Sequence, residues 1–152
     1  MKKLFLFLTV SILTLSISSC SDDDSNATPN NSTYIATGSV TINIDGNLLT
    51  YNNIIITSNG ASDINITASQ DGSSSEFLTF STTLGNVGAG VINNLQIVSA
   101  DYEQIVGYTS NTQINGNNTL QSLFTAELIT PGGGFDNPVT GQGTINIAYT
   151  VQ

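Results

Sequence analysis

The sequence predicts an all-β protein: an antiparallel β-sandwich, or a small barrel, of about eight strands. Three observations favour this class. From residue 34 onward, Thr, Ile and Val, which favour strands, recur together with Asn and Gly, which favour turns. Apolar and polar residues alternate over short stretches, as expected for strands with one buried face. Turn-forming residues separate these stretches, and none of the stretches has a helical period.

The first expected hairpin begins with an alternating strand at residues 39–45. Its apolar residues, which share one side, are Val40, Ile42 and Ile44. Asp45-Gly46 then predicts a type I′ turn, because both central positions of that turn need a positive φ. The return strand is expected at residues 48–57, with a core-like run at residues 54–56.

Six further strands are expected on the same grounds. In chain order they cover residues 63–68, 76–81, 91–98, 102–108, 119–130 and 139–151. The intervening turns and loops are Asn59-Gly60, Asp71-Gly72, residues 84–90, residues 115–118 and residues 131–138. The last of these contains two prolines and cannot be helix or central strand. In the last two strands, one face is expected to carry Phe124, Ala126 and Leu128, and one face Ile145, Ile147, Tyr149 and Val151.

Charge excludes several functions. Lys2 and Lys3 are the only basic residues, against eleven acidic ones, and the chain contains no His and no Trp. A nucleic-acid partner is therefore excluded, because neutralising phosphates requires Lys or Arg. Imidazole catalysis, Schiff-base chemistry and guanidinium clamps are also excluded, because residues 4–152 contain no His, no Lys and no Arg. The expectation is a protein that is not an enzyme.

Residues 1–19 have the layout of a secretory signal. Lys2-Lys3 precede an apolar run at residues 4–15, which is followed by small residues. The run is too short to cross a bilayer as a helix, which needs about 20 residues. The segment ends in Ile17-Ser18-Ser19-Cys20, which resembles the bacterial lipobox. This resemblance implies cleavage before Cys20 and lipidation of that cysteine. The alternative is an ordinary signal peptide followed by a chance cysteine.

The residues after Cys20 suggest a destination. Inner-membrane retention in enteric bacteria uses an Asp directly after the cysteine, whereas this chain has Ser21 followed by Asp22, Asp23 and Asp24. This order resembles the surface-export signal of Bacteroidota lipoproteins. It implies an outer-membrane protein, lipid-anchored and exposed at the cell surface. Residues 20–33 are expected to form a flexible acidic linker, and residues 34–152 the folded domain.

The domain also resembles the small, largely uncharacterised β-sandwich lipoproteins of Bacteroidota. The resemblance rests on the alternating first strand, on the hairpin Ile44-Asp45-Gly46-Asn47 and on a long C-terminal hairpin at residues 120–151. It implies a fold and a location, and no established activity.

The candidate site residues in the domain are its carboxylates: Asp45, Asp63, Asp71, Glu76, Asp101, Glu103, Glu127 and Asp136. Asp45 and Asp71 precede glycines, so turn formation explains both. Asp101 and Glu103 flank Tyr102 and would share one face of an extended segment. They are the candidates for a Ca²⁺ site or for a glycosidase pair. The alternative for this pair is a solvated strand edge, and an exposed position is also expected for Glu127.

The tyrosines offer a second possibility. A sugar-stacking platform or packing at the edge of the core would both suit Tyr34, Tyr51, Tyr102, Tyr108 and Tyr149. The leading functional hypothesis is a non-catalytic binding or accessory module, with a glycan or an envelope protein as partner. The alternatives are a carboxylate-dependent enzyme acting on polysaccharides and a structural surface subunit.

Overall fold

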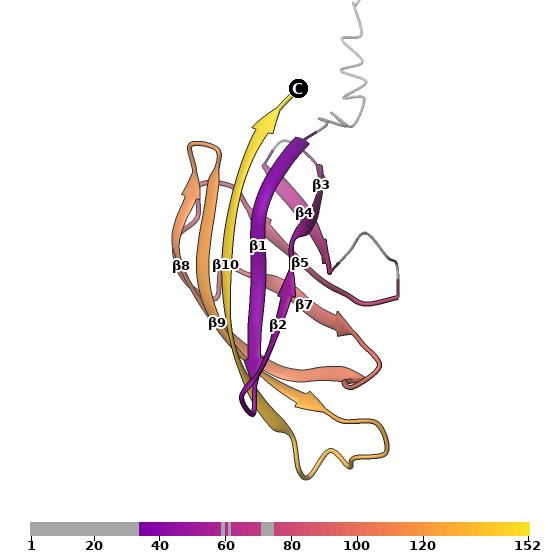
Figure 1. The fold of residues 1–152 in the computed structure, drawn as a ribbon. Helices are drawn as coiled ribbons and strands as arrows, with labels where there is room; N and C mark the ends of the chain where they lie inside the picture. The colour runs from indigo at the N-terminus through magenta and orange to yellow at the C-terminus, as the bar shows by residue number, and fades with distance from the viewer. Residues whose placement is uncertain (1–33, 59, 61, 71–74) are drawn as a thin grey trace, which may run out of the picture.

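The computed structural model describes residues 34–58, 60, 62–70 and 75–152. These residues form ten strands in two antiparallel sheets that pack against each other (Figure 1). The predicted antiparallel β-sandwich is confirmed, the alternative of a small barrel is wrong, and the strands outnumber the expected eight. In this part of the chain, no helix has the length and apolarity needed to cross a membrane.

The larger sheet has six strands, and the pairing of β1 with β10 joins the two ends of the domain. Its order is β2 (Asn47–Tyr51), β1 (Tyr34–Ile44), β10 (Val139–Val151), β9 (Thr119–Ile129), β8 (Gln104–Gly116) and β6 (Gly88–Ala89). The pairing of β1 with β10 runs from Tyr34 opposite Val151 to Ile44 opposite Gly141. We call the end of the sandwich with Tyr34 and Val151 the terminal end, and the opposite end, with the Asp45-Gly46 turn, the distal end (Figure 1).

The smaller sheet has four strands in the order β3 (Asn53–Ser58), β4 (Asp63–Ser69), β5 (Phe77–Thr83) and β7 (Asn93–Val98). The prediction of a single return strand at residues 48–57 is wrong, because this segment forms two strands, β2 and β3, which belong to different sheets. The chain passes from one sheet to the other at Asn52. Tyr51 and Ile54 are both buried. An odd spacing between two inward residues cannot fit one continuous strand, in which inward residues recur at every second position.

The core lies between the sheets and is built from the predicted alternation. Val40, Ile42 and Ile44 are buried, and so are Phe124, Ala126, Leu128, Ile145, Ile147 and Tyr149. Val151 shares their face but is exposed, because it lies at the end of β10 beyond the core. Ile55 in the expected core-like run is 55% exposed, while Ile54 and Ile56 are buried.

Strand β8 differs most from its expected limits of 102–108. It begins at Gln104, because Tyr102 turns into the core outside the strand, and it continues to Gly116. The continuation lacks apolar alternation, since its inward residues include Ser110 and Thr112. Thr112 stays buried because its Oγ1 donates a hydrogen bond to Ser122 Oγ on β9 at 3.0 Å. Polar inward residues of this kind conceal a strand from any pattern based on hydrophobicity.

Smaller differences occur elsewhere. β1 starts at Tyr34 rather than residue 39, and the expected loop at residues 84–90 contains the short strand β6. The limits of β4, β5, β7, β9 and β10 lie within two residues of those expected.

Two tight turns carry the expected backbone geometry. Asp45 and Gly46 have φ of 50° and 85°, which confirms the type I′ prediction. In the expected turn at residues 115–118, Asn117 and Asn118 have φ of 51° and 64° and form the β8–β9 turn. Asn115 and Gly116 belong to β8 instead.

Asn115 connects this hairpin to the end of β5 and to the segment that follows it. Its side-chain Nδ2 donates to Thr82 Oγ1 at 3.1 Å, to the Thr83 carbonyl at 2.8 Å and to the Asn86 carbonyl at 2.9 Å. The Gly85 N–H donates to the Asn115 carbonyl at 2.7 Å. Asn115 is buried, and its own Oδ1 has no hydrogen-bond partner among the described residues. The amide thus acts as a clamp at the terminal end.

Candidate functional site

The predicted lipidation and export residues lie outside the described residues. These are Ser18, Ser19, Cys20, Ser21, Asp22, Asp23 and Asp24, and the turn residue Asp71 is also outside them. The geometry of the site is therefore that of the domain alone.

The structure exposes the two candidate carboxylates on either side of a buried residue. Asp101 and Glu103 are exposed, and Tyr102 between them is only 8% exposed. Among the described residues, no group of three or more His, Cys, Asp or Glu side chains is placed to hold a metal ion. Neither carboxylate lines any of the three concavities described below. Within the described ranges, the pair therefore has no third ligand of these types, and it lies outside all three concavities.

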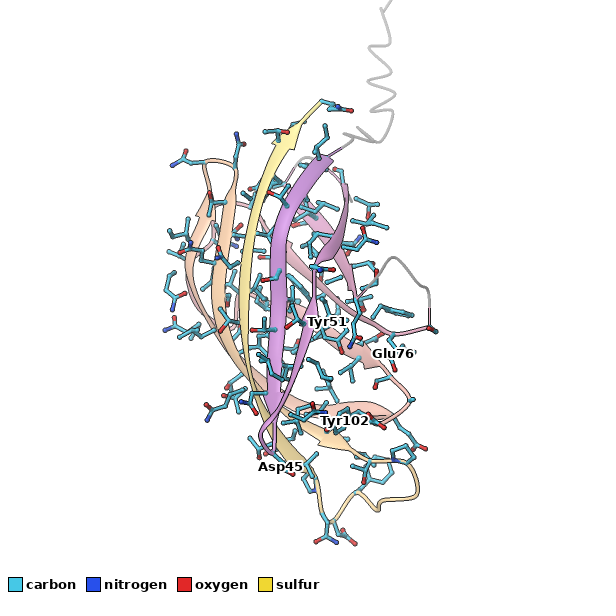
Figure 2. All side chains as sticks on the ribbon, viewed as in Figure 1. Asp45, Tyr51, Glu76 and Tyr102 are labelled. Atoms are coloured by element: carbon cyan, nitrogen blue, oxygen red, sulfur yellow. The ribbon has the colours of Figure 1, made fainter. Side chains whose placement is uncertain are left out.

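A tyrosine–acid cluster lies in the distal half of the molecule. Figure 2 shows Asp45, Tyr51, Glu76 and Tyr102, which come from four segments separated in the sequence. Tyr51 is fully buried, and its hydroxyl has no hydrogen-bond partner in the described part of the chain. Burial, with smaller contributions from Glu76 and Tyr102, raises the pKa of Tyr51 to about 12.

The pKa of Tyr102 is also raised. Burial raises its pKa above the ordinary value, and the charges of Asp101 and Asp45 add to the rise, while a side-chain hydrogen bond with Asn47 opposes it. Both phenols are therefore neutral near neutral pH. A neutral phenol is a poor nucleophile and a poor base, so the cluster is suited to packing rather than to catalysis.

The tyrosines do not form a common exposed surface. Tyr34 and Tyr149 contact each other edge to face, with ring centroids 5.9 Å apart. Tyr51, Tyr102 and Tyr149 are buried, and Tyr108 is 37% exposed. The structure does not assemble the sugar-stacking platform considered from sequence, and core packing explains most of these residues.

The largest concavity described lies on the outward face of the larger sheet, and we call it the outer groove. Its volume is about 600 Å³, within the usual range for ligand sites. Its lining comes from β1, β2, β8, β9 and β10. The lining residues are Thr41, Asn43, Leu48, Thr109, Ser110, Asn111, Leu123, Phe124, Thr125, Gln142, Gly143 and Thr144.

The strand register arranges the outward residues of the groove in two rows that run across the strands. The first row is Leu48, Asn43, Gln142, Thr125 and Thr109. The second row is Thr41, Thr144, Leu123 and Asn111. Seven of these nine side chains are amides or hydroxyls, and none is charged. Leu48 and Leu123, which are 60% and 49% exposed, are the two apolar points.

The floor of the groove is fixed by a close approach between β9 and β10. Gly143 lies opposite Phe124 and turns inward. A Cβ at Gly143 would lie 2.0 Å from Cζ of Phe124. Only glycine leaves room for the ring there, so the aromatic side chain covers the β10 backbone from the core side and supports the rows above it.

The polar side chains of the groove are mostly free. Asn43 Oδ1 accepts a hydrogen bond from the Gly46 N–H at 3.0 Å. Within the part of the chain that the structure describes, the other six polar side chains of the two rows make no side-chain hydrogen bond to protein. Their donors and acceptors face solvent and are available to a ligand.

The smaller sheet has a second concavity on its own outward face, and we call it the outer cup. Its volume is about 400 Å³, and its lining residues are Asp63, Asn65, Ser81, Thr82, Thr83, Asn93 and Asn94. Here the polar groups bind one another: Thr83 Oγ1 donates to Asp63 Oδ1, and Asn94 Nδ2 donates to Ser81 Oγ at 3.1 Å. The cup therefore offers a ligand fewer free groups than the groove does, which makes the groove the better candidate site.

A small recess of about 150 Å³ extends the groove toward the distal end. It shares Thr109 and Thr125 with the groove and adds Gly107, Tyr108 and Glu127. Glu127 is exposed, as expected from sequence, and its Oε2 lies over Gly107. The recess contributes the Glu127 carboxylate at the margin of the site, whereas Tyr108 lies opposite Ala126 and its side chain shares the inward face of that residue.

Comparison of the chain with protein-family models, with curated proteins and with solved structures finds no match. The candidate site therefore rests on geometry and chemistry alone. Sequence reasoning did not single out the groove, because its signal is spread over five strands. Exposed Leu, Thr, Asn and Gln at outward positions were visible in the sequence, but the order of the strands was not.

Proposed function

We propose that this chain is a lipid-anchored protein of the bacterial outer membrane whose β-sandwich is displayed at the cell surface as a non-catalytic binding module. The binding role is carried by one observation, the uncharged outer groove with its free polar side chains. The anchor and the location are supported by the sequence, through the lipobox-like segment ending at Cys20 and the acidic stretch that follows it. Two or more acyl chains on Cys20 would make the attachment stable.

The position of the groove suits a tethered module. The chain enters the domain at Tyr34, at the terminal end, whereas the groove lies along the flank of the larger sheet. An anchor attached at that end therefore leaves the outward face of the sheet unobstructed. The concavities also favour binding over catalysis, because none of them contains two carboxylates.

Metabolic labelling with an alkyne fatty acid tests the anchor. We expect wild type to be labelled, Cys20→Ala to be unlabelled, and Ser16→Ala, which lies upstream of the lipobox-like segment, to be labelled as wild type is. Equal labelling of Cys20→Ala and wild type would disprove lipidation at this cysteine.

Protease treatment of intact cells tests surface display. Replacing Asp22, Asp23 and Asp24 with Asn should keep the lipid label but protect the domain from external protease. If the domain is protected in wild type as well, the surface location is wrong and the protein faces the periplasm.

A further inference from the structure

We propose that the outer groove binds a neutral oligosaccharide, with the sugar hydroxyls hydrogen-bonded by the two rows of side chains. This inference deepens the proposed function, because it names the ligand class of the binding module. It rests on the charge of the groove, on its free hydrogen-bonding groups and on its dimensions.

Charge separates the groove from the rest of the domain. The domain has eight carboxylates and no basic residue, yet neither row of the groove contains a charged side chain. A cationic ligand would find no counter-charge within the rows, and an anionic ligand would meet a domain of like charge. An uncharged ligand meets neither an unpaired charge nor electrostatic repulsion in the groove.

The hydrogen-bonding groups match hydroxyls. Asn43, Asn111 and Gln142 each present an amide with both donor and acceptor atoms, and the threonines present hydroxyls that do both. A sugar hydroxyl also donates and accepts. Since six of the seven polar side chains in the rows have no side-chain hydrogen bond to any described residue, a ligand does not have to break such bonds to reach them.

The dimensions and apolar points fit a short chain of sugars. Neighbouring strands lie about 4.8 Å apart, so the five strands of the first row span roughly 19 Å, the length of several pyranose rings. Leu48 and Leu123 lie in different rows, and each offers an apolar surface to the C–H face of a ring.

Protein partners fit the groove less well. Interface hot spots are enriched in Trp, Tyr and Arg, and neither row contains any of these. A second copy of the same face would bring two concave surfaces together, and these are not complementary in shape. A strand-adding peptide would pair with a sheet edge, whereas the groove lies on a face.

Binding measured by titration calorimetry tests the proposal on the purified full-length chain in mild detergent. The probes are the neutral hexamers of glucose (α- and β-linked), xylose and mannose, with oligogalacturonate and chitosan hexamers as charged counterparts. We expect at least one neutral hexamer to bind, with an affinity that is unchanged between about 0.05 M and about 0.5 M NaCl, because no ion pair contributes. Absence of binding by every neutral hexamer would overturn the proposal.

Variants locate the site. Gln142→Ala and Thr144→Ala, both exposed, should each weaken binding by about two- to tenfold, as expected for one lost hydrogen bond. Asn65→Ala, on the outer cup, is the matched control and should leave affinity unchanged. Loss of binding in the control but not in the groove variants would place the site on the wrong sheet and overturn the proposal.

Two outcomes separate this inference from the proposed function. If only a charged hexamer binds, and the groove variants abolish that binding, the module still binds at the groove but the neutral-glycan assignment is wrong. If a neutral hexamer binds at the groove while Cys20→Ala remains fully labelled by fatty acid, the glycan inference stands and the lipid anchor at Cys20 fails.

Discussion

Asn115 and Tyr51 each bury an oxygen atom that has no hydrogen-bond partner among the described residues, but they do so in different ways. Asn115, at the terminal end, uses its amide nitrogen to hold Thr82, Thr83 and Asn86. Tyr51, on β2 beside the distal half of β1, contributes its ring to the core. The comparison shows that burial alone does not determine how much a polar group contributes to stability. The free energy lost on its removal depends on how many other buried groups it hydrogen-bonds.

The largest expected effect is that of Asn115→Ala. The substitution removes the donor for two backbone carbonyls and one hydroxyl, so we expect the free energy of unfolding to fall by about 2–4 kcal/mol. Urea denaturation measures this loss. The control is Asn111→Ala, an exposed asparagine on the same strand, which should change stability by less than about 0.5 kcal/mol. A loss this small in Asn115→Ala would show that the clamp is not what holds the terminal end.

Alkaline pH should produce the next largest effect, through Tyr51. Its pKa is raised by burial from 10.0 to about 12 in the folded protein. The contribution of the neutral phenol is complete below about pH 10, the unfolded pKa, and is lost as pH rises through the folded pKa. The free energy of unfolding should fall by about 2–3 kcal/mol through ionisation of this residue. The pKa values of Tyr102 and Tyr149 are also raised, so their ionisation acts in the same direction. Urea midpoints and phenolate absorbance between about pH 9 and pH 12 measure it; a constant midpoint would contradict the burial of the phenol.

Tyr51→Phe should have a much smaller effect on stability at neutral pH, within about 1 kcal/mol, because the deleted hydroxyl has no hydrogen-bond partner among the described residues. The variant should also lose part of the alkaline destabilisation that wild type shows. Tyr108→Phe, in which the ring is partly exposed, is the control and should keep the full alkaline loss. A loss above about 2 kcal/mol in Tyr51→Phe would mean that the hydroxyl is satisfied by water and would remove the contrast with Asn115.

Added salt should have the smallest effect on the free energy of unfolding, and it should act mainly by screening the carboxylates of the distal half. Among the described acids, Asp63 lies toward the terminal end, because it pairs with Thr83, whose carbonyl Asn115 binds. Asp45 and Glu76 lie in the distal half (Figure 2). Glu127 pairs with Thr140 and the Glu103 N–H donates to the Ile129 carbonyl, so both lie near the distal end, and Asp101 and Asp136 belong to the loops beside these strands. Screening their repulsion with about 0.5 M NaCl should raise the free energy of unfolding by up to about 1 kcal/mol. Asp101→Asn should reduce this gain more than Asp63→Asn does. Destabilisation by salt in the same titration would count against repulsion at the distal end.

Local patterns in the sequence predicted most strands and two turns, because alternation and the Asp45-Gly46 pair act over a few residues. They failed at Asn52, where the chain changes sheets, and along β8, where Ser110 and Thr112 replace apolar inward residues. They also failed for the groove. Gln142 lies beside Asn43 only because β10 pairs with β1, a contact between residues about 100 positions apart that no local pattern encodes.

The pairing of β1 with β10 also constrains how the domain is made. Strand β1 cannot be joined to β9 through β10 until residues 139–151 are present, so a growing or partly translocated chain that stops earlier has no complete core. Because Tyr34 and Val151 lie opposite each other, a short linker between them would give a circular permutant. New ends at the exposed β8–β9 turn would then make β1–β10 a local pairing, while the β8–β9 pairing would become the most distant one in the chain.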